Sequence, residues 1–80
     1  MNIQIINVIE VINGIVQAPE SFVIYEEQLS SDVVEKAEDL FVKLALENGG
    51  DEGATQNYLD DGSFDDRNGY EVIINWSNVN

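Results

Sequence analysis

The hydrophobic pattern divides the chain into two strand-like segments at its start, a helical segment in its middle and an alternating segment at its end. Residues 2–12 are rich in β-branched side chains, which pack well on a pleated sheet and lose rotamer freedom in a helix. The following Asn13-Gly14 tolerates the two positive φ angles of a type I′ turn. A second strand is therefore expected from Ile15. Pro19 cannot donate a ladder hydrogen bond, so around residues 18–20 this strand should either lie at a sheet edge or be bulged, before it resumes through residues 21–27.

Residues 30–48 have the pattern of an amphipathic helix. Asp32 with Glu35 can form a capping box at the start, and Ser30 and Ser31 are alternative caps. Asn48-Gly49-Gly50 offers a left-handed stop at the end. Apolar side chains recur every three to four residues, which predicts a stripe that packs on a sheet. The members of this stripe are Val33, Val34, Ala37, Leu40, Phe41, Leu44 and Ala45.

The last third of the chain combines a polar segment with one more strand. Residues 51–69 are rich in Gly, Asn and Asp and predict a loop. The turn dipeptides Asp61-Gly62 and Asn68-Gly69 bracket residues 63–67, where a short strand could form. Residues 70–77 then alternate with a period of two, which is typical of a half-buried strand. One face of that strand carries Tyr70, Val72, Ile74 and Trp76.

These segments predict a single domain over residues 1–80 of the α+β class. The expected architecture is a small, mostly antiparallel, three- to four-stranded sheet with one helix packed on a face, in the order β-β-α-(β)-β. Residues 2–12 are apolar on both faces of their strand, so they need two covers. The helix supplies one cover, and either the long loop or a second protomer supplies the other. Homodimerisation through this strand is therefore an open alternative.

Charge changes the picture more than any motif does. The chain has 16 acidic and three basic residues and a formal net charge of −13. Lys36 and Lys43 each follow an aspartate by four residues, which favours local helical ion pairs. Nucleic acid and anionic lipid would both be repelled, so the expected partner is a basic protein surface. The acids concentrated between residues 51 and 71 are Asp51, Glu52, Asp60, Asp61, Asp65, Asp66 and Glu71.

The composition also bears on the cellular compartment of the protein. The first residues lack the basic leader and uninterrupted apolar run of a signal peptide, and no segment approaches the roughly 20 apolar residues that span a bilayer. The absence of Cys excludes a disulfide framework. We therefore expect a cytoplasmic protein without membrane contact.

The chemistry available to this chain is limited. Neither His nor Cys is present, and no nucleophile, base and orienting group stand together in a recognisable pattern, so we expect no enzyme activity and no cofactor. Calcium would take carboxylate ligands. The EF-hand spacing fails, however. Anchoring the loop on Gly69 places Phe64 at its first position, and anchoring it on Gly62 places Leu59 at its third position and Asn68 at its twelfth. No dedicated metal site is expected, and weak cation binding by the acidic loop stays open.

The acids between residues 51 and 71 are the candidate partner-binding site. Acidic side chains on a rigid scaffold can occupy a groove whose Lys and Arg are arranged for a nucleic-acid backbone. Apolar anchors would add affinity beyond charge, and Tyr58, Phe64 and Tyr70 lie among the acids. The alternative is that the charge serves solubility alone and that these aromatics close the small core.

In overall character the chain resembles the small acidic phage-encoded inhibitors of bacterial defence, which include anti-CRISPR proteins and anti-restriction DNA mimics. The likeness covers size, charge, the absence of Cys and His and the acidic stretch Asp51–Glu71, and it includes no motif. It implies a phage protein in a bacterial host cell that binds a nuclease or CRISPR effector and blocks DNA or RNA access. Two alternatives stay open: an immunity protein or antitoxin against a basic nuclease toxin, and a structural or assembly protein that dimerises through its N-terminal strand.

Overall fold

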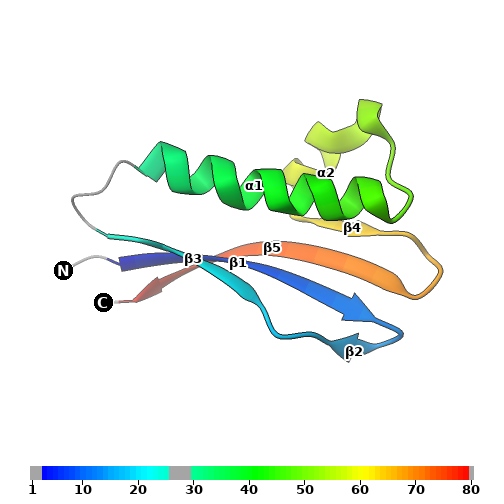
Figure 1. The fold of residues 1–80 in the computed structure, drawn as a ribbon, viewed down its shortest axis with the longest axis horizontal. Helices are drawn as coiled ribbons and strands as arrows, with labels where there is room; N and C mark the ends of the chain where they lie inside the picture. Colours follow the sequence, from blue (N-terminus) through cyan, green and yellow to red (C-terminus); the bar gives the residue numbers. More distant parts are fainter. Residues whose placement is uncertain (1–2, 26–29, 80) are drawn as a thin grey trace.

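An antiparallel sheet carries two helices on one of its faces in this protein, whose computed structural model describes residues 3–25 and 30–79 (Figure 1). In chain order the elements are β1 (Ile3–Ile12), β2 (Ile15–Val16), β3 (Glu20–Ile24), α1 (Ser30–Glu47), the 3₁₀ turn η1 (Glu52–Ala54), α2 (Thr55–Asp61), β4 (Ser63–Asp65) and β5 (Tyr70–Val79). The predicted α+β class, the antiparallel sheet and the helix on its face are confirmed. The structure adds two features, because the sheet has five strands and a second helix is present.

The hairpin predicted at Asn13-Gly14 is present. These two residues have φ angles of 51° and 81°, and Ile12 pairs with Ile15 directly across the turn. A two-residue type I′ connection has this geometry, because its twist matches the right-handed twist of the flanking strands.

Around Pro19 the strand after the hairpin lies at a sheet edge and has one extra residue, because Val11 pairs with Val16 whereas Val8 pairs with Glu20. β2 pairs with the end of β1, and β3 pairs with its beginning, from Gln4 to Val8. Between them the Gln17 amide donates a hydrogen bond to the Glu10 carbonyl. β2 and β3 therefore occupy one edge of β1 together. The predicted continuation of this strand through residues 26–27 lies outside the described residues.

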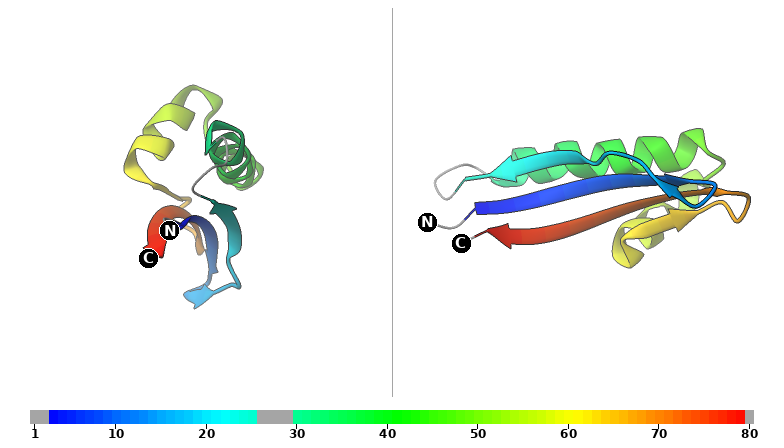
Figure 2. Two further views of the ribbon diagram at one scale, coloured as in Figure 1. Left: turned by 90° about the vertical axis from the view of Figure 1, so that its left-hand side faces the viewer. Right: turned by 90° about the horizontal axis from the view of Figure 1, so that it is seen from below.

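The two long strands of the sheet come from opposite ends of the chain. β1 and β5 pair over ten residues each, from Ile3 opposite Val79 to Ile12 opposite Tyr70. They lie side by side along the length of the molecule (Figure 2, right). β4 adds to the outer edge of β5, so the strand order is β2-β1-β5-β4, with β3 beside β2 on β1.

The observed bounds of α1 agree with the predicted helix over residues 30–48. The predicted capping box is wrong, because the helix begins at Ser30 and Asp32 therefore lies inside the first turn. A carboxylate in this turn still interacts favourably with the partial positive charge of the helix N-terminus.

The predicted left-handed stop closes the C-terminal end of α1. Gly49 has a φ of 98°, the Gly50 amide donates to the Ala45 carbonyl at 2.8 Å, and the Gly49 amide donates to the Leu46 carbonyl at 3.3 Å. This is the Schellman pattern. A side chain at Gly50 would meet the Ala45 carbonyl oxygen at 2.8 Å, so the close approach of the backbone requires glycine there.

The core lies between α1 and the sheet. Ala37, Phe41 and Ala45 follow one another at four-residue intervals and are fully buried, as the predicted stripe requires. They pack with the helix-side residues of the sheet, among which Ile6 and Val72 are also fully buried. Figure 2 (left) shows α1 and α2 on the same side of the sheet.

The opposite side of the sheet is called the open face here. No described segment covers it (Figure 2, left). Because side chains alternate along a strand and cross-strand partners share a face, its members follow from the register. They are the odd-numbered residues from Ile3 to Val11 and from Glu71 to Ser77, with Val16, Ser21, Val23, Ser63 and Asp65.

The predicted loop over residues 51–69 is wrong in one respect, since α2 forms within it. Tyr58 and Leu59 are its only large apolar side chains, and seven residues are too few to display a helical period. The ring of Tyr58 meets that of Phe64 edge to face, with centroids 4.9 Å apart. Gly62, whose φ is 75°, ends the helix and starts β4. Tertiary contact therefore stabilises a helix that the local pattern does not indicate.

Phe41→Ala should lower the free energy of unfolding by about 3–5 kcal/mol, because it leaves a cavity where a fully buried ring was. Leu40→Ala should cost less, since Leu40 is only half-buried. Denaturant unfolding measures both, and the exposed Lys43→Ala serves as the control. A larger loss for Leu40→Ala than for Phe41→Ala would contradict the observed orientation of α1.

Candidate partner-binding surface

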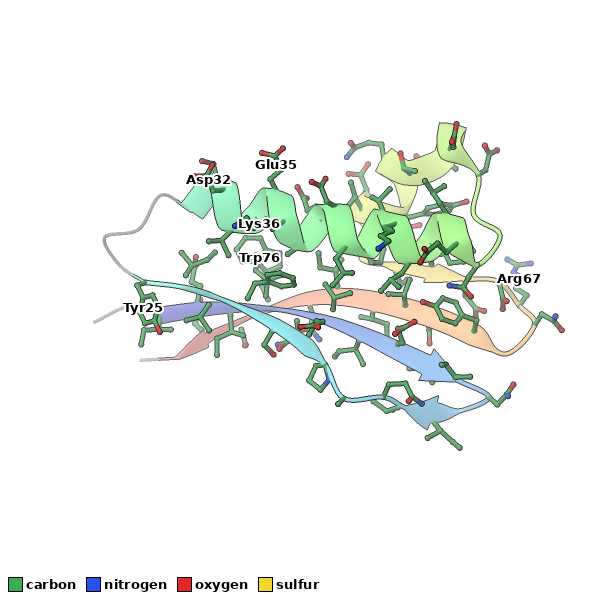
Figure 3. The ribbon with its side chains drawn as sticks, in the orientation of Figure 1. Tyr25, Asp32, Glu35, Lys36, Arg67 and Trp76 are labelled. Carbon is green, nitrogen blue, oxygen red and sulfur yellow. The ribbon has the colours of Figure 1, made fainter. Side chains whose placement is uncertain are left out.

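The helical side of the molecule is densely acidic. We call the carboxylates of α1, η1 and α2, with the residue that caps η1, the acidic layer. Its members are Asp32, Glu35, Glu38, Asp39, Glu47, Asp51, Glu52, Asp60 and Asp61. All but Glu38, which is half-buried, are exposed. Asp32 and Glu35 project from α1 away from the sheet (Figure 3).

The structure divides the predicted acidic site between two places. Four of its acids belong to the acidic layer at the η1 and α2 end, and they are Asp51, Glu52, Asp60 and Asp61. The other three, Asp65, Asp66 and Glu71, belong to β4, β5 and the turn between them. Since β4 follows α2 directly and contacts it, the two groups adjoin at one end of the molecule. We call these seven residues together the acidic end.

Several of these carboxylates hold the local backbone in place. Asp51 caps η1 by accepting from the Gly53 amide at 2.9 Å, and Asp65 accepts from the Arg67 amide at 2.7 Å. Asp66 accepts from the amides of Asn68 at 2.7 Å and Tyr70 at 2.9 Å. Asn and Asp side chains commonly stabilise turns in this way. A high density of acids in this segment is therefore partly a requirement of its turns.

Three acids of the acidic layer, Glu52, Asp60 and Asp61, make few contacts with the rest of the fold. Asp60 accepts only from the Gln56 side chain at 3.0 Å, one turn earlier on α2. Glu52 and Asp61 are exposed, and their carboxylates accept no hydrogen bond from a described residue. These three carboxylates can therefore be offered to a partner without loss to the fold.

Internal cations do not neutralise this surface. The predicted helical ion pairs of Lys36 and Lys43 are wrong: across residues 3–25 and 30–79, neither ammonium lies within 4.0 Å of a carboxylate. Arg67, at the exposed turn between β4 and β5, likewise makes no ion pair with a described residue (Figure 3). Lys36 and Lys43 lie on α1 among these carboxylates, so they reduce the negative potential of the acidic layer without forming ion pairs, and salt reduces it further.

The aromatic residues of the predicted site are part of the core. Phe64 and Tyr70 are each 8% exposed, and Tyr58 is half-buried against Phe64. They give little surface to a partner, which is the placement that the core-closing alternative requires. The exposed aromatic side chains of the described residues are Tyr25 and Trp76, at 58% and 52%.

Sequence reasoning did not single out Trp76 as exposed. It falls on the same strand face as the buried Tyr70 and Val72, so alternation predicts burial. β4 pairs with β5 only from Glu71 to Ile73, and α2 contacts β4, so both lie toward the other end of β5 from Trp76 (Figure 1). No signal in the sequence could have shown where this cover ends.

A hydrogen bond between the buried Tyr70 and the half-buried Glu10 joins β5 to β1 on the helix side of the sheet. The Tyr70 phenol donates a hydrogen bond of 2.7 Å to Glu10 Oε2. Burial of the ring is the main reason that the pKa of Tyr70 is raised above its usual 10.0, and the hydrogen bond to Glu10 is the next. The negative charges of Glu10, Glu47 and Asp66 act in the same direction.

Two shallow cavities are candidates for small ligands. One of about 330 Å³ lies beside the β4–β5 turn, and one of about 290 Å³ lies along the first half of α1. The first is lined by Val11, Gly14, Asp65, Arg67, Gly69, Tyr70 and Glu71, and the second by Asp32, Glu35, Lys36 and Asp39. Among the described residues, no group of three acidic side chains is placed to hold a metal ion. No described helix is both long and apolar enough to cross a membrane.

No protein-family model, curated protein or solved structure matches this chain. The surface described above is therefore interpreted from its own geometry and charge.

Tyr70→Phe should remove a pH dependence of stability. In wild type the folded protein holds the phenolic proton more tightly than the unfolded chain does, so this contribution is complete below pH 10 and is lost as the pH rises above it. Between pH 9 and pH 11, wild type should lose about 1.4 kcal/mol of unfolding free energy relative to Tyr70→Phe. Denaturant unfolding between pH 9 and 11 measures this difference, and parallel profiles of the two proteins would contradict it.

Proposed function

We propose that the chain is an inhibitor that binds the basic nucleic-acid-binding surface of another protein, such as a nuclease or a CRISPR effector, and blocks DNA or RNA access. The observation that carries this proposal is the unneutralised acidic layer: carboxylates are exposed along α1, η1 and α2, and the three cations of the chain make no ion pair with the described residues. Such a surface attracts Lys and Arg over long distances and is repelled by nucleic acid itself.

The contact is proposed to centre on the acidic end. There, carboxylates come from η1, α2, β4 and β5, whereas elsewhere in the layer they come from α1 alone. Asp65 lies directly opposite Glu71 across the β4–β5 ladder, a placement of like charges that destabilises a sheet. A cationic partner would relieve this repulsion. The bacterial cytoplasm is the compartment in which such partners act on nucleic acid.

A second candidate uses the same surface. An immunity protein or antitoxin that neutralises a basic nuclease toxin would need the same complementarity, and the two roles differ only in the identity of the partner. The solubility alternative differs physically, because it requires no particular group of acids and predicts that charge reversals at any two places have equal effects.

The triple variant Glu52→Lys, Asp60→Lys and Asp61→Lys should abolish partner binding and leave the fold intact. Its three carboxylates are exposed and make no contact that the turns require. The partner is obtained by capturing proteins on the immobilised chain and eluting them with duplex DNA. Its affinity for each variant is then measured at increasing salt concentrations. Wild-type binding should weaken steeply with salt, because association releases counterions from the charged surfaces and added salt opposes that release.

The matched control reverses the same number of acids in the first half of α1, at Asp32, Glu35 and Asp39. These lie in the same layer, and the net charge changes equally. Circular dichroism and the melting temperature of both variants show whether the fold is retained. If the control loses binding as fully as the test variant, contact at the acidic end is wrong, and salt-independent binding would contradict an electrostatic partner altogether.

A further inference from the structure

The open face combines apolar side chains with a near absence of charge. Ile5, Ile9, Val11 and Ile73 lie on it half-buried, and Val16 is 67% exposed. Its only described charged residues are Asp65 and Glu71, which are opposite each other at one end. The chain as a whole has a net charge of −13, yet β1 and β5 carry almost no charge on this side. This difference indicates that the open face has a different partner from the acidic layer.

Hydrogen-bonded pairing along β1 is closed to a partner. β5 occupies one edge of β1 over its whole length, and β2, Gln17 and β3 occupy the other. The N-terminal strand can therefore meet another protein only through its side chains on the open face. Packing of sheet against sheet is the general solution for such a face.

We propose that the open face binds a second copy of the chain, so that two sheets pack face to face and the helices lie outside. Charge argues for this occupant. Among its described residues the open face offers a basic partner only Asp65 and Glu71, at one end, whereas the uncharged remainder of the face can pack against that of a second copy. Two sheets pack about 10 Å apart and each helix adds about 10 Å, so the two acidic layers are roughly 30 Å apart, several Debye lengths at physiological salt.

The available area agrees with a weak dimer. The five strands hold 30 residues, and each covers about 3.3 Å by 4.8 Å of the sheet, so the face offers about 480 Å² on each copy. The total of about 950 Å² lies below the usual range for stable interfaces and is typical of weak, transient ones. Self-association is therefore expected in the high micromolar range.

A row of neutral polar side chains crosses the middle of the open face and orients the dimer. The Ser21 hydroxyl donates to Asn7 Oδ1 at 2.7 Å, and the Asn7 amide donates to Asn75 Oδ1 at 3.2 Å. These hydrogen bonds already satisfy some of the polar groups of the row in the monomer, which lowers the free-energy cost of burying them in a dimer. A two-fold axis along this row, perpendicular to the strands, would bring Asn7 and Asn75 of both copies together.

The two acids on the open face select the same axis. A two-fold axis parallel to the strands would stack the Asp65 and Glu71 ends of both copies on each other and bring four carboxylates together. An axis along the polar row instead places the acidic end of the face of one copy over the Ile3 end of the other. Like-charge repulsion is lowest in this second arrangement.

Sedimentation equilibrium from low to high micromolar concentration tests the proposal. Wild type should change from monomer to dimer over this range, and added salt should strengthen the dimer slightly, because it screens the repulsion between the two copies. Ile9→Lys should weaken the dimer at least about tenfold, since it would bury an unpaired ammonium between the sheets. The matched control Ile15→Lys adds the same charge to the helix-side surface of β2 and should leave dimerisation unchanged.

A second pair of variants guards against loss of the fold. Ser77 and Asn78 are both exposed neighbours on β5, and only Ser77 lies on the open face. Ser77→Glu should weaken the dimer, whereas Asn78→Glu should not. A wild-type chain that remains monomeric at high micromolar concentration, or equal effects of the two members of either pair, would overturn the proposal.

The outcome can be distinguished from that of the proposed inhibitor function, although Asp65 and Glu71 belong to both surfaces. The triple variant Glu52→Lys, Asp60→Lys and Asp61→Lys changes the acidic layer alone and should remain as dimeric as wild type. Opposite salt dependences separate the two interactions, since binding to a basic surface weakens with salt and the dimer does not.

Discussion

Ten residues near the start of the chain pair with ten near its end, and this β1–β5 ladder is the frame on which the other elements are placed. β2 and β3 complete one side of it, β4 begins the other, and α1 packs across it. The ladder closes almost the whole chain into one loop, so its entropic cost must be met before its contacts form. The apolar core is small, with Ile6, Val8 and Val72 of the two strands packed against α1. A weakened β1–β5 pairing would therefore remove the support of the helix and the acidic layer together.

Alternation on these two strands separates the surface of the molecule by chemistry. Even-numbered residues of β1 and β5 face the helices, and odd-numbered residues form the open face. The carboxylates are carried mainly by α1, η1 and α2, and α1 and α2 lie on the same side of the sheet. The net charge alone therefore does not describe this surface. A charge of −13 spread evenly would repel another copy of the chain from every direction, whereas the observed distribution leaves the open face almost uncharged.

Local signals predicted the elements whose pattern is self-contained. The β-branched run of β1, the Asn13-Gly14 turn, the apolar stripe of α1 and its Gly49 stop each act within a few residues, and each is observed. The helix α2 was missed because its stability comes from the contact of Tyr58 with Phe64 and from packing on α1. The candidate site was predicted less well for a similar reason. The acids could be found by counting, but the burial of Phe64 and Tyr70 depends on a sheet register that connects distant parts of the chain.

The two proposed interactions would combine in a particular way. In a dimer packed through the open faces, the acidic layers point in opposite directions and are separated by two sheets and two helices. One basic groove could not contact both layers, so dimerisation would not tighten binding to a single partner molecule by direct contact. It would instead allow each dimer to engage two basic proteins, or two sites of a symmetric one whose spacing matches, with the gain set by effective concentration. The open face would therefore set how many partner molecules one assembly binds, and the acidic layer would set how tightly each one is bound.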